Sequence, residues 1–437
     1  MRFTIGICRR GYNNRCLHDA TKACMLLIQP ANKRRKSSAR IGLAIAGGGP
    51  IGGMYELGAL RALDDALEGL DLTRLEVYVG VSSGAFLAAG LANRMNTEEM
   101  CRIFITGQDD RLRFRPEAFL RPAVLEYMRR AAGFPALLVG WWRELLMHPG
   151  GARLSEAIAR FSSLIPTGLF DNSEVEHFLR DAFTIRGRSN DFRELERPLY
   201  VVAVDLNSGD AVRFGDGEWS DVPISRAVQA SAAMPGLYPP VQIRGRHFVD
   251  GALRRTMHAS VALKHGVDLL IGINPLVPFN SSATSTTPEY MTNLADGGLP
   301  VVLSQTFRTL LQSRAQVGIA RYAQQFPQTD QLVLEPNSND AEMFFTNVFS
   351  FSSRIRVCQH AYRATLDDLG KRRAELAPLL ARHGLRLREE VIDDPRRTLI
   401  GGLRELPHPT DTTARLRRAL DDVDDALRRR KRAARGA

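Results

Sequence analysis

The stretch IGLAIAGGGPIGG at residues 41–53 runs from a short apolar segment into a glycine-rich turn, and LEVYVGVSSG at residues 75–84 repeats this arrangement. The apolar segments are typical of buried parallel strands, and apolar residues at helical spacing follow the turns over 54–67 and 85–93. A strand, a helix, a second strand and a second helix within about fifty residues indicate an α/β sheet that is covered by helices on both faces.

The second turn places a serine where it can act as a nucleophile. A G-x-S-x-G turn between a strand and a helix, here Gly80, Ser82 and Gly84, exposes the serine hydroxyl on a sharp elbow that faces a helix N-terminus. The first turn can donate backbone N–H groups to an oxyanion. Because the turns follow successive strands, we expect them side by side at the carboxyl edge of the sheet. The pair predicts acyl-transfer chemistry, most simply ester hydrolysis.

The first turn also fits a dinucleotide-binding fingerprint, as Gly47-x-Gly49-x-x-Gly52. That interpretation requires an acidic residue at the end of the second strand, where it would hold a ribose. The second strand ends instead in the serine turn, and the Gly-Lys-Ser/Thr of a phosphate-binding loop is absent from the first. Nucleotide binding is therefore the weaker interpretation.

A serine nucleophile needs a base, and none of the nine histidines lies in a motif that marks it as one. His247 lies in an alternating strand pattern that fits a surface or sheet residue equally well. Asp250 ends an apolar strand, so we expect it at the same carboxyl edge as Ser82. A carboxylate can accept the serine proton directly if burial raises its basicity. An ordinary Asp-Gly turn explains this local sequence equally well.

Three blocks in this order, G-G-G-x-x-G, G-x-S-x-G and D-G-A, resemble the patatin-like phospholipase family. The resemblance implies a three-layer α/β/α fold with a mainly parallel central sheet and a Ser–Asp dyad without histidine. It implies Ser82 as the nucleophile and Asp250 as the base. It also implies an oxyanion loop at Gly47, Gly48, Gly49 and Gly52, with further motif positions at Gly80, Gly84, Gly251 and Ala252. Segments 205–209 and 230–241 are similar to the family too, and the match covers roughly residues 41–275.

One position departs from the family pattern. The family often has an arginine or lysine before the last glycine of the oxyanion loop, where this chain has Ile51. Pro50 also removes one N–H donor from the loop. The missing cation weakens the expectation of an anionic phospholipid substrate, whereas the remaining backbone donors leave the expected chemistry unchanged.

The chain as a whole divides by composition into four parts. The expected catalytic domain, 41–275, contains a helical insertion over about 100–196, and a mainly helical region covers 276–400. The insertion carries an apolar segment with Trp141 and Trp142, for which a role as a lid or interfacial surface is a hypothesis. Residues 1–40 are predicted to form a disordered basic extension, or Met25 is the true start. A charged tail occupies 401–437.

The charge of the chain is concentrated at its ends. The 437 residues carry +11, of which +9 lies in residues 1–40 and +6 in residues 428–437, so the body carries −4. Five cysteines without a C-x-x-C pair argue against a disulfide framework and a zinc site, and no cofactor is expected. No apolar run approaches the roughly 20 residues of a membrane span, and no signal-peptide core is present. We therefore expect a cytoplasmic protein, in which peripheral membrane association is an open alternative.

The leading hypothesis is a serine lipid acyl hydrolase that acts on a lipid or acyl-ester substrate. An acyltransferase on the same site, with an alcohol in place of water, has the same sequence features. A third alternative is a catalytically inert protein whose basic tails bind membrane or nucleic acid. Intact Ser82 and Asp250 disfavour that alternative, and nucleic acid is not an expected partner. The oligomeric state does not follow from the sequence.

Overall fold

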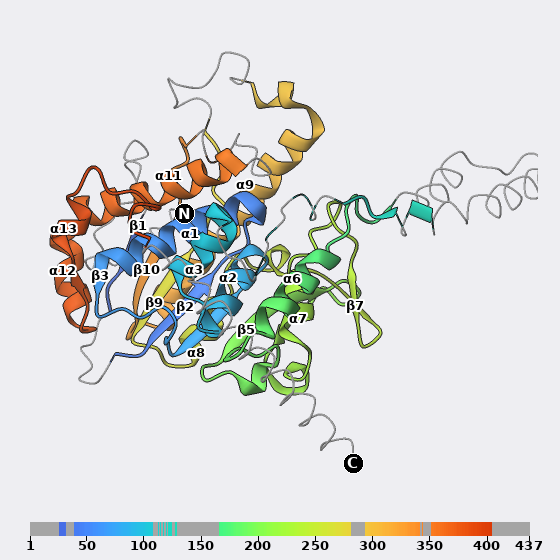
Figure 1. Ribbon diagram of the computed structural model, residues 1–437, viewed down its shortest axis with the longest axis horizontal. Helices are drawn as coiled ribbons and strands as arrows, with labels where there is room; N and C mark the ends of the chain where they lie inside the picture. Colours follow the sequence, from blue (N-terminus) through green and yellow to red (C-terminus); the bar gives the residue numbers. More distant parts are fainter. Residues whose placement is uncertain are drawn as a thin grey trace, which may run out of the picture. The chain divides into compact units, whose positions relative to one another are not determined.

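We describe a computed structural model of the chain (Figure 1). The description covers 26–31, 39–107, 112, 114, 117, 119, 121–124, 127–128, 166–280, 293–340, 343 and 351–403. The chain forms two compact units, of which the first extends to Leu399. The second unit begins at Ile400, and only its first four residues are described. The segment with Trp141 and Trp142 and most of the two basic ends lie outside the described residues.

A mixed sheet forms the centre of the first unit (Figure 1). Its described strands are β1 (Leu26–Gln29), β2 (Ile41–Ile45), β4 (Val77–Gly80), β5 (Leu199–Asp205), β6 (Ala211–Phe214), β7 (Val241–Ile243), β8 (Arg246–Asp250), β9 (Leu269–Ile273) and β10 (Asp330–Leu334). Their order across the sheet is β1-β10-β9-β2-β4-β5-β8-β7, and β6 also pairs with β5. Strands β10, β9, β2, β4 and β5 are parallel, whereas β1, β6 and β8 are antiparallel to their neighbours in this set. The α/β class with a mainly parallel sheet is confirmed.

Helices connect the strands and cover the sheet. The α-helices are α1 (Gly49–Ala66), α2 (Ser83–Ala92), α3 (Thr97–Cys101), α6 (Ser173–Phe183), α7 (Ile224–Ser231), α8 (Ser260–Lys264), α9 (Gly298–Gln325), α11 (Phe351–Lys371), α12 (Arg373–Ala381) and α13 (Glu389–Ile392). Shorter helical turns are η2 (Arg102–Thr106), η4 (Phe192–Glu194), η5 (Gly217–Trp219), η6 (Gly251–Leu253) and η9 (Leu294–Gly297). A separate two-stranded ribbon pairs β3 (Leu67–Glu68) with β11 (Arg386–Leu387).

The two faces of the sheet bury different helices. Ala44, Val79 and Leu270 pack in one apolar cluster with α8 and with the buried side of α9. Because side chains alternate along a strand, Leu43 and Ile45 point to the opposite face, where Figure 1 shows α1 and α11 side by side. The sheet is therefore the middle of three layers, as the sequence predicts.

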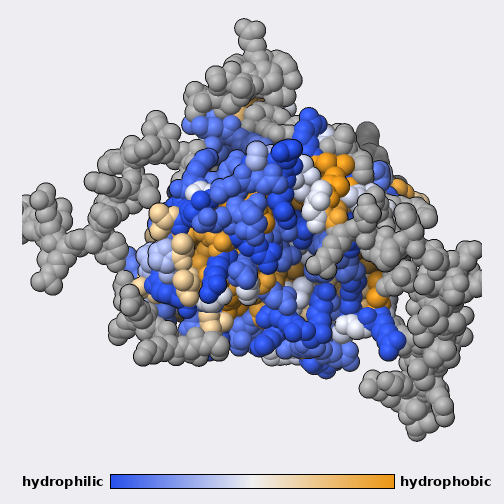
Figure 2. Space-filling model, turned by 60° about the vertical axis from the view of Figure 1, so that its left-hand side comes forward, coloured by the Kyte–Doolittle hydropathy of each residue, from blue (hydrophilic) through white to orange (hydrophobic). Residues whose placement is uncertain are grey.

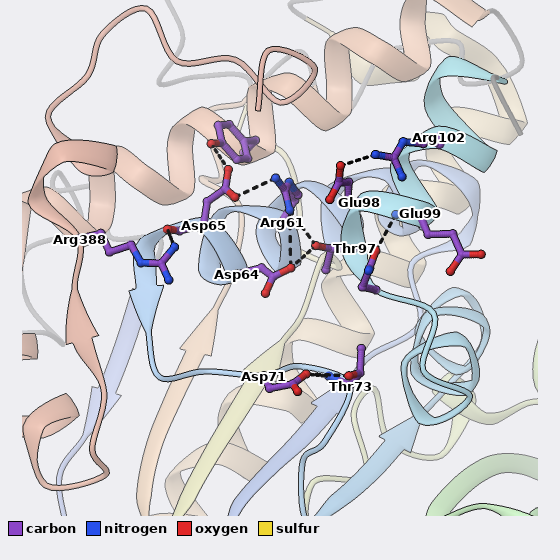
Figure 3. A network of polar contacts seen from close by, with 12 residues as sticks. Arg61, Asp64, Asp65, Asp71, Thr73, Thr97, Glu98, Glu99, Arg102 and Arg388 are labelled. Atoms are coloured by element: carbon purple, nitrogen blue, oxygen red, sulfur yellow. Dashed lines mark hydrogen bonds and ion pairs between the residues drawn. The ribbon is translucent and has the colours of Figure 1, made fainter. Parts of the chain in front are cut away.

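The region after residue 276 is built into the same unit as the motifs. Strand β10 pairs with β9, and α11 lies against α1. Asp65, near the end of α1, is buried and forms an ion pair with Arg61 at 2.8 Å. It also accepts a hydrogen bond from the Tyr362 hydroxyl at 2.8 Å, and its backbone carbonyl accepts one from Arg388 (Figure 3). The expected division at residue 275 is therefore not a boundary of the compact unit.

Two further local predictions differ from the structure. Leu26–Gln29 forms the edge strand β1, paired with β10, although the sequence places it in a disordered extension. This segment is short, and its register is given by a strand some three hundred residues away, which no local pattern reveals. The sequence pattern over about 356–383 predicts one helix. The structure has two helices there, α11 and α12, with Pro378 inside the second.

The described surface is mostly hydrophilic, with apolar residues reaching it in patches (Figure 2). Among the described residues, no helix is both long enough and apolar enough to span a bilayer.

The contact between α1 and α11 depends on a glycine. A Cβ atom at Gly58 would lie 2.3 Å from the carbonyl oxygen of Cys358 and 2.9 Å from the Cβ of Ala361. We expect Gly58→Ala to lower the free energy of unfolding by about 1–3 kcal/mol, the usual cost of overpacking. Gly318→Ala in α9 is the matched control, because its Cβ would meet only Tyr322 at 4.0 Å, and it should be neutral or stabilising. Urea unfolding of both variants tests this, and equal stabilities would contradict it.

Candidate active site

Ser82 lies at the elbow between β4 and α2 and is 5% exposed. Its backbone has a φ of 52° and a ψ of −121°, a conformation that costs a non-glycine residue on the order of 1–3 kcal/mol. The elbow also brings α2 against the end of β2, where a Cβ at Gly84 would lie 2.4 Å from the Ala46 carbonyl oxygen. A Cβ at Gly80 would lie 2.4 Å from the Cα of Ala85. The two glycines of the motif are therefore required by close backbone approach.

A buried serine holds the strained peptide in place. The Ser82 N–H donates to the Oγ of Ser231 at 2.8 Å, and that hydroxyl donates to the Val202 carbonyl at 2.6 Å. Ser231 ends α7 and Val202 lies in β5, so the elbow is tied to two elements distant in the sequence. Ser231 lies in the segment 230–241 that resembles the family, but no local sequence pattern indicates this contact with Ser82.

Asp250 lies beside Ser82, but for a reason that differs from the predicted one. The sequence predicts both residues at the carboxyl edge of parallel strands, whereas β8 runs antiparallel to β5. Gly80 of β4 pairs with Val201 of β5, so Ser82, two residues after Gly80, lies level with Ala203. Ala203 in turn pairs with Asp250 of β8. The end of β8 meets the elbow because β4 is short and β5 continues past it.

The Asp250 carboxyl is fully buried. Its Oδ1 accepts a hydrogen bond from the Ala252 N–H at 2.8 Å, and a Cβ at Gly251 would lie 2.1 Å from the Val202 carbonyl oxygen. Burial raises the pKa of Asp250 to about 6, while the Ser82 hydroxyl and the Ala252 N–H oppose the rise. Its Oδ2 has no partner of good hydrogen-bond geometry among the described residues. The carboxyl is therefore more basic than usual and lies close to the Ser82 hydroxyl.

The four glycines of the loop differ in whether their backbone N–H groups have a hydrogen-bond acceptor. The Gly47 N–H donates to the Thr256 carbonyl at 3.2 Å, and the Gly52 N–H donates to the Gly48 carbonyl within α1 at 3.1 Å. The Gly48 N–H donates to the Oγ of Ser83 at 2.9 Å. The Gly49 N–H, at a φ of +62°, has no acceptor in the described part of the chain. The four glycines therefore do not act alike, and Gly49 is the one with an available donor.

A hydrogen-bond relay joins the glycine loop to the elbow. The Ser83 hydroxyl accepts from Gly48 and donates to the Oε1 of Glu56 at 3.0 Å. Glu56 is fully buried in α1, and burial raises the pKa of its carboxyl well above the ordinary value. The relay orients two segments 35 residues apart. The only local signal of this relay in the sequence is one acidic residue, Glu56, in the apolar run MYELGAL.

Histidine takes no part in the lining of this site among the described residues. His258 is the one that approaches it, with its Nε2 3.4 Å from the Gly251 carbonyl oxygen, and burial lowers the pKa of His258 to about 4. His247 lies in β8 opposite Gln242. In the same part of the chain, no group of three or more His, Cys, Asp or Glu side chains is placed to hold a metal ion.

Ser82 and Asp250 open into one apolar cavity of about 190 Å³. Its walls come from several elements and are mainly aromatic and aliphatic: Met54, Phe86, Leu87, Phe104, Phe114, Phe119, Val175, Val228, Met234, Leu237 and Tyr238. Arg354 of α11 also lines it, with its Nη1 donating to the Phe104 carbonyl at 2.8 Å. The cavity has the character of a site for an apolar chain, with the reactive groups and one cation in its wall.

The profile of the patatin-like phospholipases matches residues 43–263, about half of the chain. The chain belongs to this family. The matched region contains the glycine loop, the serine elbow and Asp250, so the family predicted from the three motifs is confirmed.

Similar proteins include uncharacterized NTE family proteins of Mycobacterium tuberculosis and Mycobacterium bovis. Each is 26% identical over 231 residues, which cover 52% of this chain but only 29% of the relative. Among solved structures, VipD from Legionella pneumophila is 16% identical, with a TM-score of 0.34 over 80% of this chain and 70% of that one. Human GIVD cytosolic phospholipase A2 is 12% identical, with a TM-score of 0.31 over 80% and 61%.

The buried Asp250 carboxyl makes the stability of this patatin-like protein depend on pH. Its pKa in the folded chain is about 6, against 3.8 when unperturbed. The contribution of the protonated Asp250 carboxyl to the free energy of unfolding is therefore fully present at low pH and is lost as the pH rises through 6. The amide of Asp250→Asn cannot ionise, so the stability of the variant relative to wild type should increase by about 2.4 kcal/mol between pH 4 and pH 7.5. Urea unfolding at the two pH values measures this, and a constant difference would contradict it.

Proposed function

We propose that this chain is a serine lipid acyl hydrolase in which Ser82 is the nucleophile and Asp250 the general base. The observation that carries the proposal is the opening of both groups into one apolar cavity, with Ser82 on a strained elbow and Asp250 buried beside it. An elbow serine presents its Oγ to a carbonyl carbon, and an aspartate with a raised pKa is a better proton acceptor than an exposed one.

Acylation begins when Asp250 accepts the hydroxyl proton of Ser82 as the Oγ attacks the ester carbonyl. The negative charge that forms on the carbonyl oxygen is stabilised by the N–H groups of Gly49 and Ser83, at the N-termini of α1 and α2. The carbon–oxygen bond to the alcohol then breaks, and Asp250 returns the proton to the departing alkoxide oxygen. The acyl group remains on Ser82 as an ester, with its chain in the apolar cavity.

Deacylation repeats these steps with water as the nucleophile. Asp250 accepts a proton from the water as its oxygen attacks the acyl carbon, and the same two N–H groups stabilise the second oxyanion. The bond to the Ser82 Oγ breaks, the Oγ takes the proton back from Asp250, and the carboxylic acid leaves. The site therefore returns to its starting protonation state without a histidine.

Substitution of the two residues tests their assignment. Ser82→Ala should abolish hydrolysis of p-nitrophenyl esters and labelling by a fluorophosphonate probe. Asp250→Asn should lower the rate at least about 10²-fold, because it keeps the shape of the side chain but cannot accept a proton. In wild type, kcat/KM should rise with pH and reach half its maximum near pH 6, the pKa of Asp250.

Other results would assign the chemistry differently. Labelling of another serine in Ser82→Ala would remove Ser82 from the mechanism. A nearly wild-type Asp250→Asn enzyme together with an inactive His258→Ala enzyme would make a histidine the base. Release of free fatty acid from vesicles, measured with and without an added alcohol, distinguishes hydrolysis from acyl transfer.

The relay from Glu56 through Ser83 should affect the rate through the oxyanion. Glu56→Ala removes the acceptor for the Ser83 hydroxyl and should lower kcat at least about tenfold with KM nearly unchanged, since the oxyanion exists only after attack. Glu56→Gln is the matched control, because its amide oxygen can accept the same hydrogen bond without charge, and it should restore most of kcat. A Glu56→Ala enzyme that is folded by its thermal transition and retains full kcat would contradict this role.

A further inference from the structure

Helix α9 is apolar on two sides, and only one of them packs on the protein. Its inner side contributes Leu311, Ile319 and Tyr322 to the core cluster. Its described outer side carries six of the eleven large hydrophobic residues that are exposed in the described part of the chain: Leu299, Val302, Leu303, Phe307, Leu310 and Val317. These exposed side chains are therefore concentrated on one helix, whereas single exposed leucines are common on any surface.

Four of these residues form a continuous line along α9. Leu299, Leu303, Leu310 and Val317 are separated by four, seven and seven positions, which places them on the same side of an α-helix. Their exposed fractions are 70%, 46%, 56% and 68%. At 1.5 Å per residue, the line extends about 27 Å. We call these four residues and their flanking cations, Arg314 and Arg321, the outer face of α9.

The outer face carries positive charge only. The sequence of α9 contains three arginines and no aspartate or glutamate over its 28 residues. Arg314 and Arg321 are exposed and lie four residues after Leu310 and Val317, respectively, on the same side of the helix. An apolar line flanked by cations is the pattern of helices that lie in the interface of an anionic bilayer.

The outer face lies beside the candidate active site. The side of α9 that packs on the protein is held by Gln312, which accepts a hydrogen bond from Asn274 at 3.1 Å, next to the Pro275 that contacts Gly48. Arg314 donates through its Nη1 to the Leu253 carbonyl at 3.0 Å, three residues after Asp250. Figure 1 shows α9 at the same end of the fold as the start of α1. A surface that binds α9 would therefore be close to the cavity with Ser82.

We propose that the outer face of α9 docks on the surface of an anionic lipid bilayer and so brings the cavity to its lipid substrate. The proposal rests on the lipid acyl hydrolase function given above. A second copy of the chain is the weaker occupant, because a symmetric contact through this face would place Arg314 and Arg321 against the same cations of the other copy. A bilayer with acidic headgroups offers both the apolar depth and the opposite charge.

Vesicle binding tests the docking independently of catalysis. Binding is measured by sedimentation with vesicles of phosphatidylglycerol and phosphatidylcholine. The protein carries Ser82→Ala, so that no lipid is hydrolysed during the assay. We expect binding, and we expect Leu303→Glu/Leu310→Glu in the same background to weaken it at least about tenfold, because two exposed leucines no longer enter the bilayer. Arg321→Glu should weaken it on these vesicles but not on pure phosphatidylcholine.

The matched control is Leu206→Glu, the same substitution at a leucine that is 52% exposed at the end of β5, outside α9. It should bind vesicles like the parent protein. With Ser82 restored, Leu303→Glu/Leu310→Glu should lose at least about ten times more activity on vesicles than on a soluble short-chain ester. Absence of ester turnover in wild type would contradict the proposed function, while the sedimentation result would still decide the docking.

Three results would overturn the docking proposal. The first is that the Ser82→Ala protein does not bind anionic vesicles. The second is that Leu303→Glu/Leu310→Glu leaves vesicle binding unchanged, and the third is that Leu206→Glu loses as much vesicle binding as the double variant. A dimer in analytical ultracentrifugation that the double substitution abolishes, without an effect on vesicle binding, would assign the face to a second copy. If the double variant does not fold by its thermal transition, Leu299→Gln/Val317→Gln changes the same face without adding charge and is judged by the same criteria.

Discussion

The backbone conformation at Ser82 is the constraint on which the rest of the site depends. Its positive φ turns the chain sharply from β4 into α2, and the turn exists only because Gly80 and Gly84 permit backbone contacts that a Cβ would block. The strain is offset by the hydrogen bond from the Ser82 N–H to Ser231. The same turn places Ser82 and Ser83, the first residue of α2, next to each other in the wall of the cavity. In the proposed mechanism, the nucleophile and one oxyanion donor therefore come from one local geometry.

Two buried carboxyl groups, those of Glu56 and Asp250, lie near this elbow, and burial raises the pKa of both. The consequences differ because their partners differ. Asp250 lies next to a hydroxyl that can give up a proton, so its raised basicity serves the proposed chemistry. Glu56 accepts a hydrogen bond from Ser83 and is favoured in its neutral form, so it positions the loop without placing a charge near the oxyanion.

The region beyond the family match completes both the cavity and its surroundings. Helix α11 contributes Arg354 to the cavity wall, although the position in the loop where relatives often carry a cation is Ile51. This arginine supplies a positive charge from a different element. Helix α9 packs beside the same edge and leaves its outer face of leucines and arginines exposed. Substrate selection in this chain can therefore be determined by elements outside the segment that carries the motifs.

The sequence alone determined the family, the α/β class and the identity of Ser82 and Asp250 as candidates, because glycine turns and apolar runs act through local geometry. Only the tertiary structure showed why Asp250 lies beside Ser82, since the antiparallel direction of β8 and the extra length of β5 are properties of strand pairing. It also separated Gly49 from the other loop glycines. The N–H groups of Gly47 and Gly48 find acceptors on distant segments, the Gly52 N–H bonds within the loop, and the Gly49 N–H has no acceptor in the described part of the chain. Glu56, Ser231 and β1 were missed for the same reason: their partners lie far away along the chain, where no local pattern can indicate them.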